Sequence, residues 1–244
     1  MHQPVAATRR IRLWDGPTRL FHWLLVAAVA SALTTGLIGG SAMELHGRVG
    51  LAIAGLLVFR LAWGFAGNRQ ARFASFLPTP ASLRAYVRGQ WHGVGHNPLG
   101  ALSVLALLLL LSLQVASGLF GNDEISFTGP FAARVSEDLS LWLTGWHRRF
   151  ANLLYLLLSL HLAAILFYRL VKKEDLVQAM VTGYKQLPEA HPAQEAPRAS
   201  KWALLLALAL AFAAVLLLSG ALWQHDELPA ASAPVSQAPP KPAW

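Results

Sequence analysis

The sequence of 244 residues contains no cysteine. This absence excludes disulfide bonds, catalytic thiolates, iron–sulfur clusters, zinc–thiolate sites and covalently attached c-type haem. Charge is also scarce, because Asp, Glu, Lys and Arg make up only 13% of the chain. A bound metal would therefore depend on the nine histidines, with carboxylate, Met or Tyr side chains as lesser candidates.

Long hydrophobic runs dominate the rest of the chain. Hydrophobic residues reach 55% and the mean hydropathy is +0.44, well outside the range of soluble globular domains. Five stretches approach the ~20 apolar residues that a helix needs to cross ~30 Å of hydrocarbon, with Trp and Tyr at their ends. They cover about residues 20–40, 46–66, 98–120, 146–168 and 202–223. The sequence therefore predicts an all-α integral membrane protein.

The charges predict how these helices are oriented. Fifteen of the 20 Lys and Arg lie in segments 1–20, 60–96 and 169–201, whereas segments 41–48, 121–149 and 223–244 hold seven of the 12 acids. The positive-inside rule then places the N-terminus in the cytoplasm and the C-terminus in the periplasm. Nucleic-acid binding is excluded, because no basic stripe with interleaved aromatic residues remains. A signal peptide is an alternative for the N-terminus, although the apolar run is longer than such peptides use.

Four histidines lie in or at the ends of the apolar runs: His22, His46, His147 and His161. His147 and His161 are 14 residues apart, which is only 40° short of four helical turns and about 21 Å along the axis. They therefore share one helix face at two depths. The predicted orientation places His22 at the depth of His161, and His46 at the depth of His147.

Each predicted pair offers one imidazole from each of two helices, which is what a six-coordinate haem iron between helices requires. Small residues beside the proposed ligands, Gly50 and Ala151, suit a flat macrocycle but equally suit ordinary helix packing. A histidine taken singly has simpler explanations: an interfacial polar residue for His46 or His147, and a buried hydrogen-bonded ring or a proton path for His161. The joint pattern of matched depths favours haem.

Other polar residues carry weaker signals. His92 and His96 lie four residues apart in a Gly-rich stretch, which favours a solvated loop over a contact with quinone or a haem edge. Gln114 and Ser117 are expected to hydrogen-bond within the helix bundle rather than to form a site. Arg148 and Arg149 follow His147 and are either haem-propionate partners or interfacial anchors.

The sequence resembles the bacterial cytochrome b561 family, which includes the cytochrome b subunits of nickel–iron hydrogenases. The resemblance covers about residues 10 to 185, with FHW early and two histidines 14 apart late as its most specific features. It rests on four stretches: RLWDGPTRLFHWLLV, ELHGRVGLAIAGLLVFRLAWGF, GHNPLGALSVLALLLLLSLQVASGLF and TGWHRRFANLLYLLLSLHLAAILFYRLVKKEDLVQAMVTG.

The resemblance implies a four-helix transmembrane bundle that binds two haem b groups, with His22 and His161 on one iron and His46 and His147 on the other. The fifth helix and the Pro/Ala-rich tail depart from the shortest members. The expected division is 1–19 cytoplasmic segment, 20–185 di-haem domain, 186–200 cytoplasmic linker, 201–224 fifth transmembrane helix and 225–244 disordered periplasmic tail.

The implied function is electron transfer across the bacterial inner membrane between the quinone pool and a periplasmic redox partner such as a c-type cytochrome. The net acidic segment before His147, with Asp123, Glu124, Glu137 and Asp138, is a candidate docking site for that partner. Alternatives are a quinol or superoxide oxidoreductase without a protein partner, a hydrogenase-type cytochrome b anchor subunit, and a proton-linked transporter with little or no haem. A homodimer stays open.

Overall fold

The computed structural model describes residues 8–189 and 199–222. Five of its helices are long and apolar enough to cross a membrane. They are α1 (Gly16–Ile38), α2 (Ala42–Ala66), α4 (Pro98–Leu119), α5 (Glu137–Phe167, extended by a π-helical segment, Tyr168–Lys172) and α7 (Lys201–Leu218). Shorter elements join them: η1 (Phe73–Ser75), α3 (Pro80–Val87), η2 (Ala132–Arg134) and α6 (Leu176–Thr182).

Helix α1 begins four residues before the predicted start at residue 20. Asp15 is the N-cap, and its carboxylate accepts a hydrogen bond of 2.8 Å from the backbone N–H of Thr18. The same carboxylate accepts a bond of 3.2 Å from the indole N–H of Trp63 in α2. This cap satisfies an N–H that the first helical turn would otherwise leave unpaired, and it ties the start of α1 to α2.

Helix α5 is longer than the predicted span of 146–168. Ser136 caps it by accepting from the N–H of Leu139 at 3.3 Å, and Glu137 and Asp138 lie in the first turn, where negative charge favours a helix N-terminus. His147 is therefore almost three turns inside the helix and not at its end, which corrects the predicted boundary.

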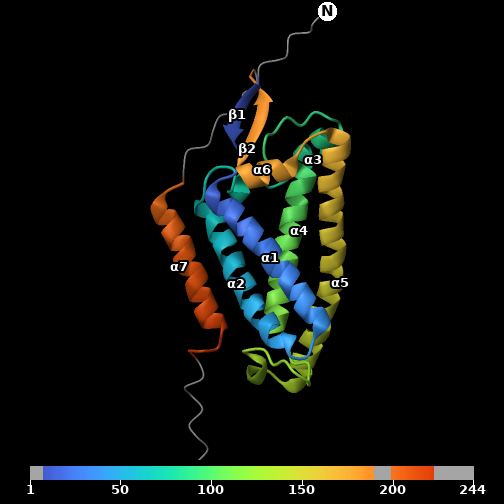
Figure 1. Ribbon diagram of the computed structural model, residues 1–244, viewed down its shortest axis with the longest axis vertical. Coiled ribbons are helices and arrows are strands. Elements are labelled where there is room, and N and C mark those ends of the chain that lie inside the picture. The colour runs from blue at the N-terminus through green and yellow to red at the C-terminus, as the bar shows by residue number, and fades with distance from the viewer. Residues whose placement is uncertain (1–7, 190–198, 223–244) are drawn as a thin grey trace, which may run out of the picture.

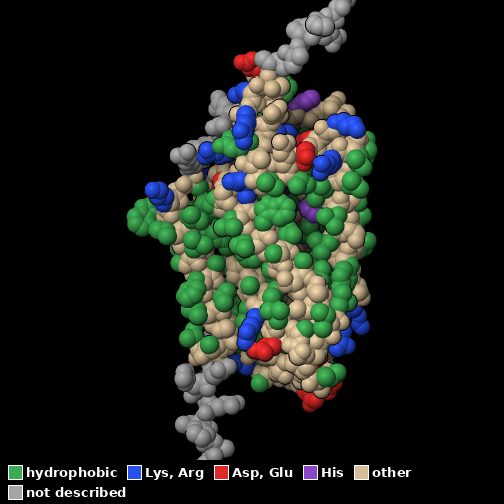
Figure 2. All heavy atoms as spheres, viewed as in Figure 1, with side chains coloured by type: hydrophobic (Ala, Val, Ile, Leu, Met, Phe, Trp, Pro, Cys, Tyr) green, Lys and Arg blue, Asp and Glu red, His purple; other side chains and the backbone are tan. Residues whose placement is uncertain are grey.

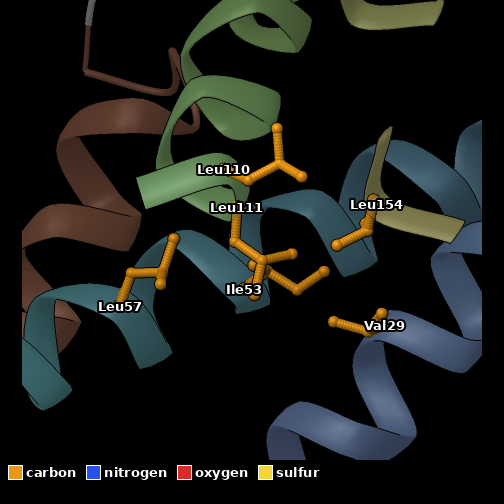
Figure 3. Packing of buried hydrophobic residues seen from close by; sticks show 6 residues of the cluster. All are labelled: Val29, Ile53, Leu57, Leu110, Leu111 and Leu154. Carbon is orange, nitrogen blue, oxygen red and sulfur yellow. The ribbon is translucent and has the colours of Figure 1, made fainter. Parts of the chain in front are cut away.

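The hydrophobic core is shared by α1, α2, α4 and α5. Helix α2 contacts α1, α4 and α7, and α4 also packs against α5. A central cluster of buried side chains draws on all four helices (Figure 3): Val29, Ile53, Leu57, Leu110, Leu111 and Leu154.

Helix α7 lies outside this core, along α2 (Figure 1). Gly55 of α2 permits the close approach, since a Cβ atom there would lie 2.7 Å from Cγ2 of Val215. Small residues of this kind let membrane helices pack tightly.

A two-stranded antiparallel ladder was not predicted and corrects the all-α expectation. Strand β1 (Thr8–Arg12) pairs with β2 (Tyr184–Pro188), which begins inside the predicted di-haem domain and continues into the predicted linker. Ile11 and Leu187 are buried while most of their neighbours are polar. Much of the predicted linker and the whole predicted tail lie outside the described residues.

The two ends of the molecule differ in structure and charge. We name the end with β1 and β2 the ladder end, and the end with residues 120–136 the loop end (Figure 1). Figure 2 shows apolar side chains across the middle of the visible face and Lys and Arg side chains gathered toward the ladder end. Five apolar helices between two polar ends describe a multi-pass membrane protein.

Candidate functional site

Two histidine rings meet between α2 and α5 near the loop end. The ring centroids of His46 and His147 are 6.0 Å apart, and the ring planes are inclined by 76°. Two metal–imidazole bonds of roughly 2 Å each, together with the radius of each ring, span about the same distance. The separation therefore suits one metal ion between the two rings.

Hydrogen bonds fix the tautomer of both rings. Nδ1 of His46 lies 2.9 Å from the carbonyl oxygen of Ala32, and Nδ1 of His147 lies 2.9 Å from that of Gln114. A carbonyl oxygen only accepts, so each Nδ1 must carry the proton. Each Nε2 then keeps its lone pair for a metal, the arrangement found behind most metal-bound histidines.

The supporting residues on α1 and α4 repeat one pattern. A hydroxyl lies three residues after each acceptor carbonyl: Thr35 Oγ1 is 3.3 Å from Nδ1 of His46, and Ser117 Oγ is 3.2 Å from Nδ1 of His147. A glycine follows each hydroxyl residue. The segments ALTTGL and QVASGL share this pattern in the sequence, but the pattern alone does not show that either hydroxyl faces a histidine.

The two glycines make room for the rings. A Cβ atom at Gly36 would lie 3.2 Å from Cε1 of His46, and one at Gly118 would lie 3.1 Å from Cε1 of His147. Both distances are shorter than ordinary van der Waals contacts. Any larger residue would push the ring that its helix supports.

A cavity of about 490 Å³ surrounds this histidine pair. Its walls are mainly apolar, and the predicted small residues Gly50 and Ala151 both line it, as do Gly36 and Gly118. This is the size and character of a cofactor pocket. The cradle, the donor set and the fixed tautomers together fit a bis-histidine haem.

The two arginines after His147 lie in different surroundings. Arg148 lines the cavity, together with Asn152 and Tyr155. Arg149 is not among the lining residues, and its guanidinium lies over the ring of Trp146, 5.1 Å from the centroid. Arg148 is therefore the better placed of the two to meet a carboxylate in the cavity.

The predicted docking segment closes over the loop end of this cavity. Phe127 packs edge-on against His46 at 6.3 Å. The carboxylate of Asp123 accepts hydrogen bonds from the N–H groups of Ile125, Ser126 and Phe127 at 2.8–3.0 Å. Partial burial acts to raise the pKa of Asp123, but these hydrogen bonds outweigh it and hold the pKa below its usual value.

The second predicted pair, His22 and His161, lies nearer the ladder end. The two side chains are close enough for their charges to interact, but no ring contact joins them among the described residues. Nδ1 of His22 is buried and has no hydrogen-bond partner within the described part of the chain. The structure thus brings this pair into one region without the direct ring contact of His46 and His147.

His96 is not the solvated loop residue that the sequence favoured. Its ring stacks on Phe76 at 4.9 Å and packs edge-on against Trp14 at 4.7 Å. Burial, with smaller contributions from Arg60 and His161, lowers the pKa of His96 to about 4. The correction arises because the chain between α3 and α4 folds back over aromatic residues, whereas His92 is exposed as predicted.

Comparison with known proteins tests the predicted family. A model of the prokaryotic cytochrome b561 family matches residues 13–183. Similar proteins include the probable Ni/Fe-hydrogenase 1 B-type cytochrome subunit of Escherichia coli K12, 22% identical over 71% of this chain and 89% of that protein. The probable Ni/Fe-hydrogenase B-type cytochrome subunit of Azotobacter chroococcum is 24% identical over 75% of this chain and 91% of that protein. No solved structure gives a significant match.

The family match covers most of the chain, including all four predicted histidines and the helices α1, α2, α4 and α5 that carry them. Helix α7 lies outside the matched residues. The chain therefore belongs to the prokaryotic cytochrome b561 family of membrane b-type cytochromes.

Proposed function

We propose that this protein carries electrons across the inner membrane through two haem b groups, between the quinone pool and a redox partner. Residues 20–185 form the di-haem unit, in which α1, α2, α4 and α5 make the haem-binding four-helix bundle. His46 and His147 hold the loop-end haem, and His22 and His161 hold the ladder-end haem.

One observation carries this proposal. His46 and His147 meet at 6.0 Å, and each has Nδ1 bound to a backbone carbonyl at 2.9 Å. A pair of neutral histidines held only for packing needs neither matched tautomers nor glycines opposite both rings. Both features are expected where each Nε2 must point at one metal ion.

The ladder-end pair follows from the continuity of α5. The helix is unbroken from His147 to His161, so His161 presents the same face about four turns farther along. His22 in α1 is its neighbour across the bundle. The assignment is supported by the matched depth of the two histidines and by the half-buried position of His22 within the bundle.

Haem held by a histidine from each of two helices would supply one-electron transfer and would leave no coordination position open for oxygen or substrate. The chain itself holds the rings of His46 and His147 through the two backbone carbonyls and lines the cavity with mainly apolar side chains. Neutral ligands also avoid the cost of an unpaired charge inside the membrane.

The charge distribution supports an orientation with the ladder end in the cytoplasm. Lys and Arg concentrate there, in β1, α3 and the segment after α5. The C-terminus and the acidic loop end would then face the periplasm, which places the loop-end haem beside a periplasmic partner.

A hydrogenase is the second candidate partner, alongside a c-type cytochrome. The similar proteins bear the name of Ni/Fe-hydrogenase B-type cytochrome subunits. In that case the protein is the membrane subunit of an oxidoreductase complex, and its haems take electrons from the hydrogenase.

The test is the haem content of the purified protein and of single-histidine variants. We expect two haems per chain from the absorption spectrum. His46→Ala or His147→Ala should remove the loop-end haem and leave most of the ladder-end haem, and His22→Ala or His161→Ala should do the reverse.

His92→Ala is the matched control, because His92 is exposed in the loop before α4. Its spectrum should equal that of the wild type. A ratio of one haem per chain, or an unchanged spectrum in His161→Ala, contradicts the di-haem assignment.

A further inference from the structure

Arg60 is a buried cation inside a membrane helix. Its side chain is only 5% exposed, although it belongs to the apolar span of α2. Its Nη1 is buried and has no hydrogen-bond partner, and no ion pair among the described residues includes it. A buried cation with an unsatisfied donor is costly in such a place, so the position favours the binding of an anion.

Among the described residues, one acid, Asp15, influences Arg60, and its carboxylate also accepts hydrogen bonds from other groups. Asp15 lies close enough to act on its charge. Both carboxylate oxygens of Asp15 accept other hydrogen bonds, one from the Thr18 N–H and one from the Trp63 indole. Asp15 therefore offsets part of the charge of Arg60 but leaves its buried Nη1 without a hydrogen-bond acceptor.

The helix places Arg60 at the depth of the ladder-end pair. Arg60 is 14 residues after His46 on the unbroken helix α2, just as His161 is 14 residues after His147 on α5. Both spacings return to nearly the same helix face after four turns. Arg60 therefore faces the interior of the bundle at the depth where α5 presents His161.

His96 lies close to Arg60, and aromatic rings join the two side chains. The guanidinium of Arg60 lies over the ring of Phe73 at 4.6 Å and that of Phe76 at 5.8 Å, and Phe76 in turn stacks on His96. Nδ1 of His96 is also buried without a hydrogen-bond partner within the described residues. Arg60 and His161 both act electrostatically on His96, which places His96 near the ladder-end site.

We propose that Arg60, assisted by Nδ1 of His96, binds a propionate carboxylate of the ladder-end haem. This inference rests on the proposed function, because it needs a haem between His22 and His161. A guanidinium and a carboxylate form paired, charge-assisted hydrogen bonds, which satisfy both buried groups at once. A neutral His96 adds one donor and no further charge.

The experiment compares Arg60→Gln, Arg60→Lys and His96→Phe in the purified haem-loaded protein. The readouts are the midpoint potential of each haem and the redox-difference infrared spectrum in the carboxylate region. A nearby cation disfavours the more positive oxidised iron, so its loss should lower the potential of the ladder-end haem. We expect the ratio of reduced to oxidised haem at fixed potential to fall about tenfold, roughly 59 mV for one electron.

The loop-end haem should keep its potential in Arg60→Gln. Arg60→Lys keeps the charge but not the paired hydrogen bonds, so it should lower the ladder-end potential less than Arg60→Gln does. His96→Phe keeps the ring packing and should shift the carboxylate bands with a smaller change in potential. Arg88→Gln is the matched control, because it removes an exposed arginine from the same end of the molecule. Loss of the ladder-end haem from Arg60→Gln but not from Arg60→Lys also supports the proposal.

The inference is overturned if Arg60→Gln leaves both the ladder-end potential and the carboxylate bands at the values of Arg88→Gln. It is equally overturned if Arg60→Lys lowers the ladder-end potential as far as Arg60→Gln does, since the retained positive charge then has no effect. Both results leave the di-haem function standing. A wild-type protein without a ladder-end haem instead removes the function and the inference together.

Discussion

His147 presents Nε2 to the cavity because the Gln114 carbonyl holds Nδ1 and because Gly118 leaves space for the ring. The hydrogen bond sets the tautomer, and the missing side chain sets the position of the ring. His46 depends in the same way on Ala32 and Gly36. The position of each histidine ring therefore depends on the glycine opposite it, which has no Cβ atom, as well as on the carbonyl that holds Nδ1.

Substitution of Gly118 tests this dependence. In Gly118→Ala the new Cβ would lie 3.1 Å from Cε1 and 3.3 Å from Nδ1 of His147, so the ring must shift or lose its bond to the Gln114 carbonyl. Changes to the partners of a ligating histidine commonly cost about tenfold in affinity for the metal centre. We therefore expect loop-end haem binding to weaken by that order, measured as haem occupancy, with the ladder-end haem retained.

Gly145→Ala is the control for this variant. It lies two residues before His147 on α5, and within 4 Å a Cβ there would meet only the Arg149 side chain, at 3.9 Å. Alanine also favours a helix interior over glycine, so no loss is expected. Full occupancy in Gly118→Ala would show that the ring does not depend on this space.

The ligand candidates could be predicted from the sequence, but their supporting residues could not. His22, His46, His147 and His161 stand out because ionisable residues are rare in membrane helices. The hydroxyls of Thr35 and Ser117 bond to the carbonyls of Ser31 and Leu113 in their own helices, which is the ordinary behaviour of such residues. Their additional contact with a histidine depends on how two helices pack, which a single sequence does not reveal.

Among the elements, hydropathy predicts the long helices and misses the short strands. The five spans are confirmed as helices because each must satisfy its own backbone hydrogen bonds in hydrocarbon. Strands β1 and β2 have five residues each and pair across most of the chain length, so neither carries a local signal. The early starts of α1 and α5 depend on the caps Asp15 and Ser136, which follow no apolar pattern.

The charges of the segments between the helices predict how the protein is oriented in the membrane. Reporter fusions after Gly40 and after Phe120 should read as exported, because these positions lie at the loop end. Fusions near Gln70 and Tyr184 should read as cytoplasmic, because the flanking segments hold most of the Lys and Arg. The measurement is the activity of a reporter that is active only in the periplasm, paired with one that is active only in the cytoplasm.

A variant with altered charge provides the control for orientation. Neutral substitutions of Arg9, Arg10 and Arg12 weaken the cytoplasmic signal and should raise the minority of inverted molecules. A reversed pattern at Gly40 and Gln70 in the unchanged protein would place the ladder end outside, and the partner of the loop-end haem would then be cytoplasmic.

At the scale of the whole molecule, the two histidine pairs lie at two depths in one bundle, and the loop end covers one of them. Residues 121–136 pack over the His46–His147 cavity through Phe127. Three acids on this end, Glu124, Glu137 and Asp138, are exposed, whereas Asp123 is occupied in holding the loop together. Residues 121–138 hold four acids against Arg134, so a partner that docks on this stretch meets a net acidic segment, with Arg148 and Arg149 farther along α5.

The exposed acids predict how a basic c-type cytochrome should respond. Complementary charge raises the rate of encounter by roughly 10- to 1000-fold at low salt. The triple variant Glu124→Gln, Glu137→Gln and Asp138→Asn should therefore slow second-order electron transfer by about tenfold and flatten its dependence on ionic strength. Asp123 is left unchanged so that the loop and the haem spectra stay intact.

Glu44→Gln is the control, because that exposed acid pairs with Arg48 at the same end and contributes little net field. If the triple variant matches Glu44→Gln with every cytochrome c tested, the acids do not steer a partner. A hydrogenase subunit that binds the membrane protein permanently then becomes the better candidate, because a permanent complex needs no long-range electrostatic attraction to transfer electrons.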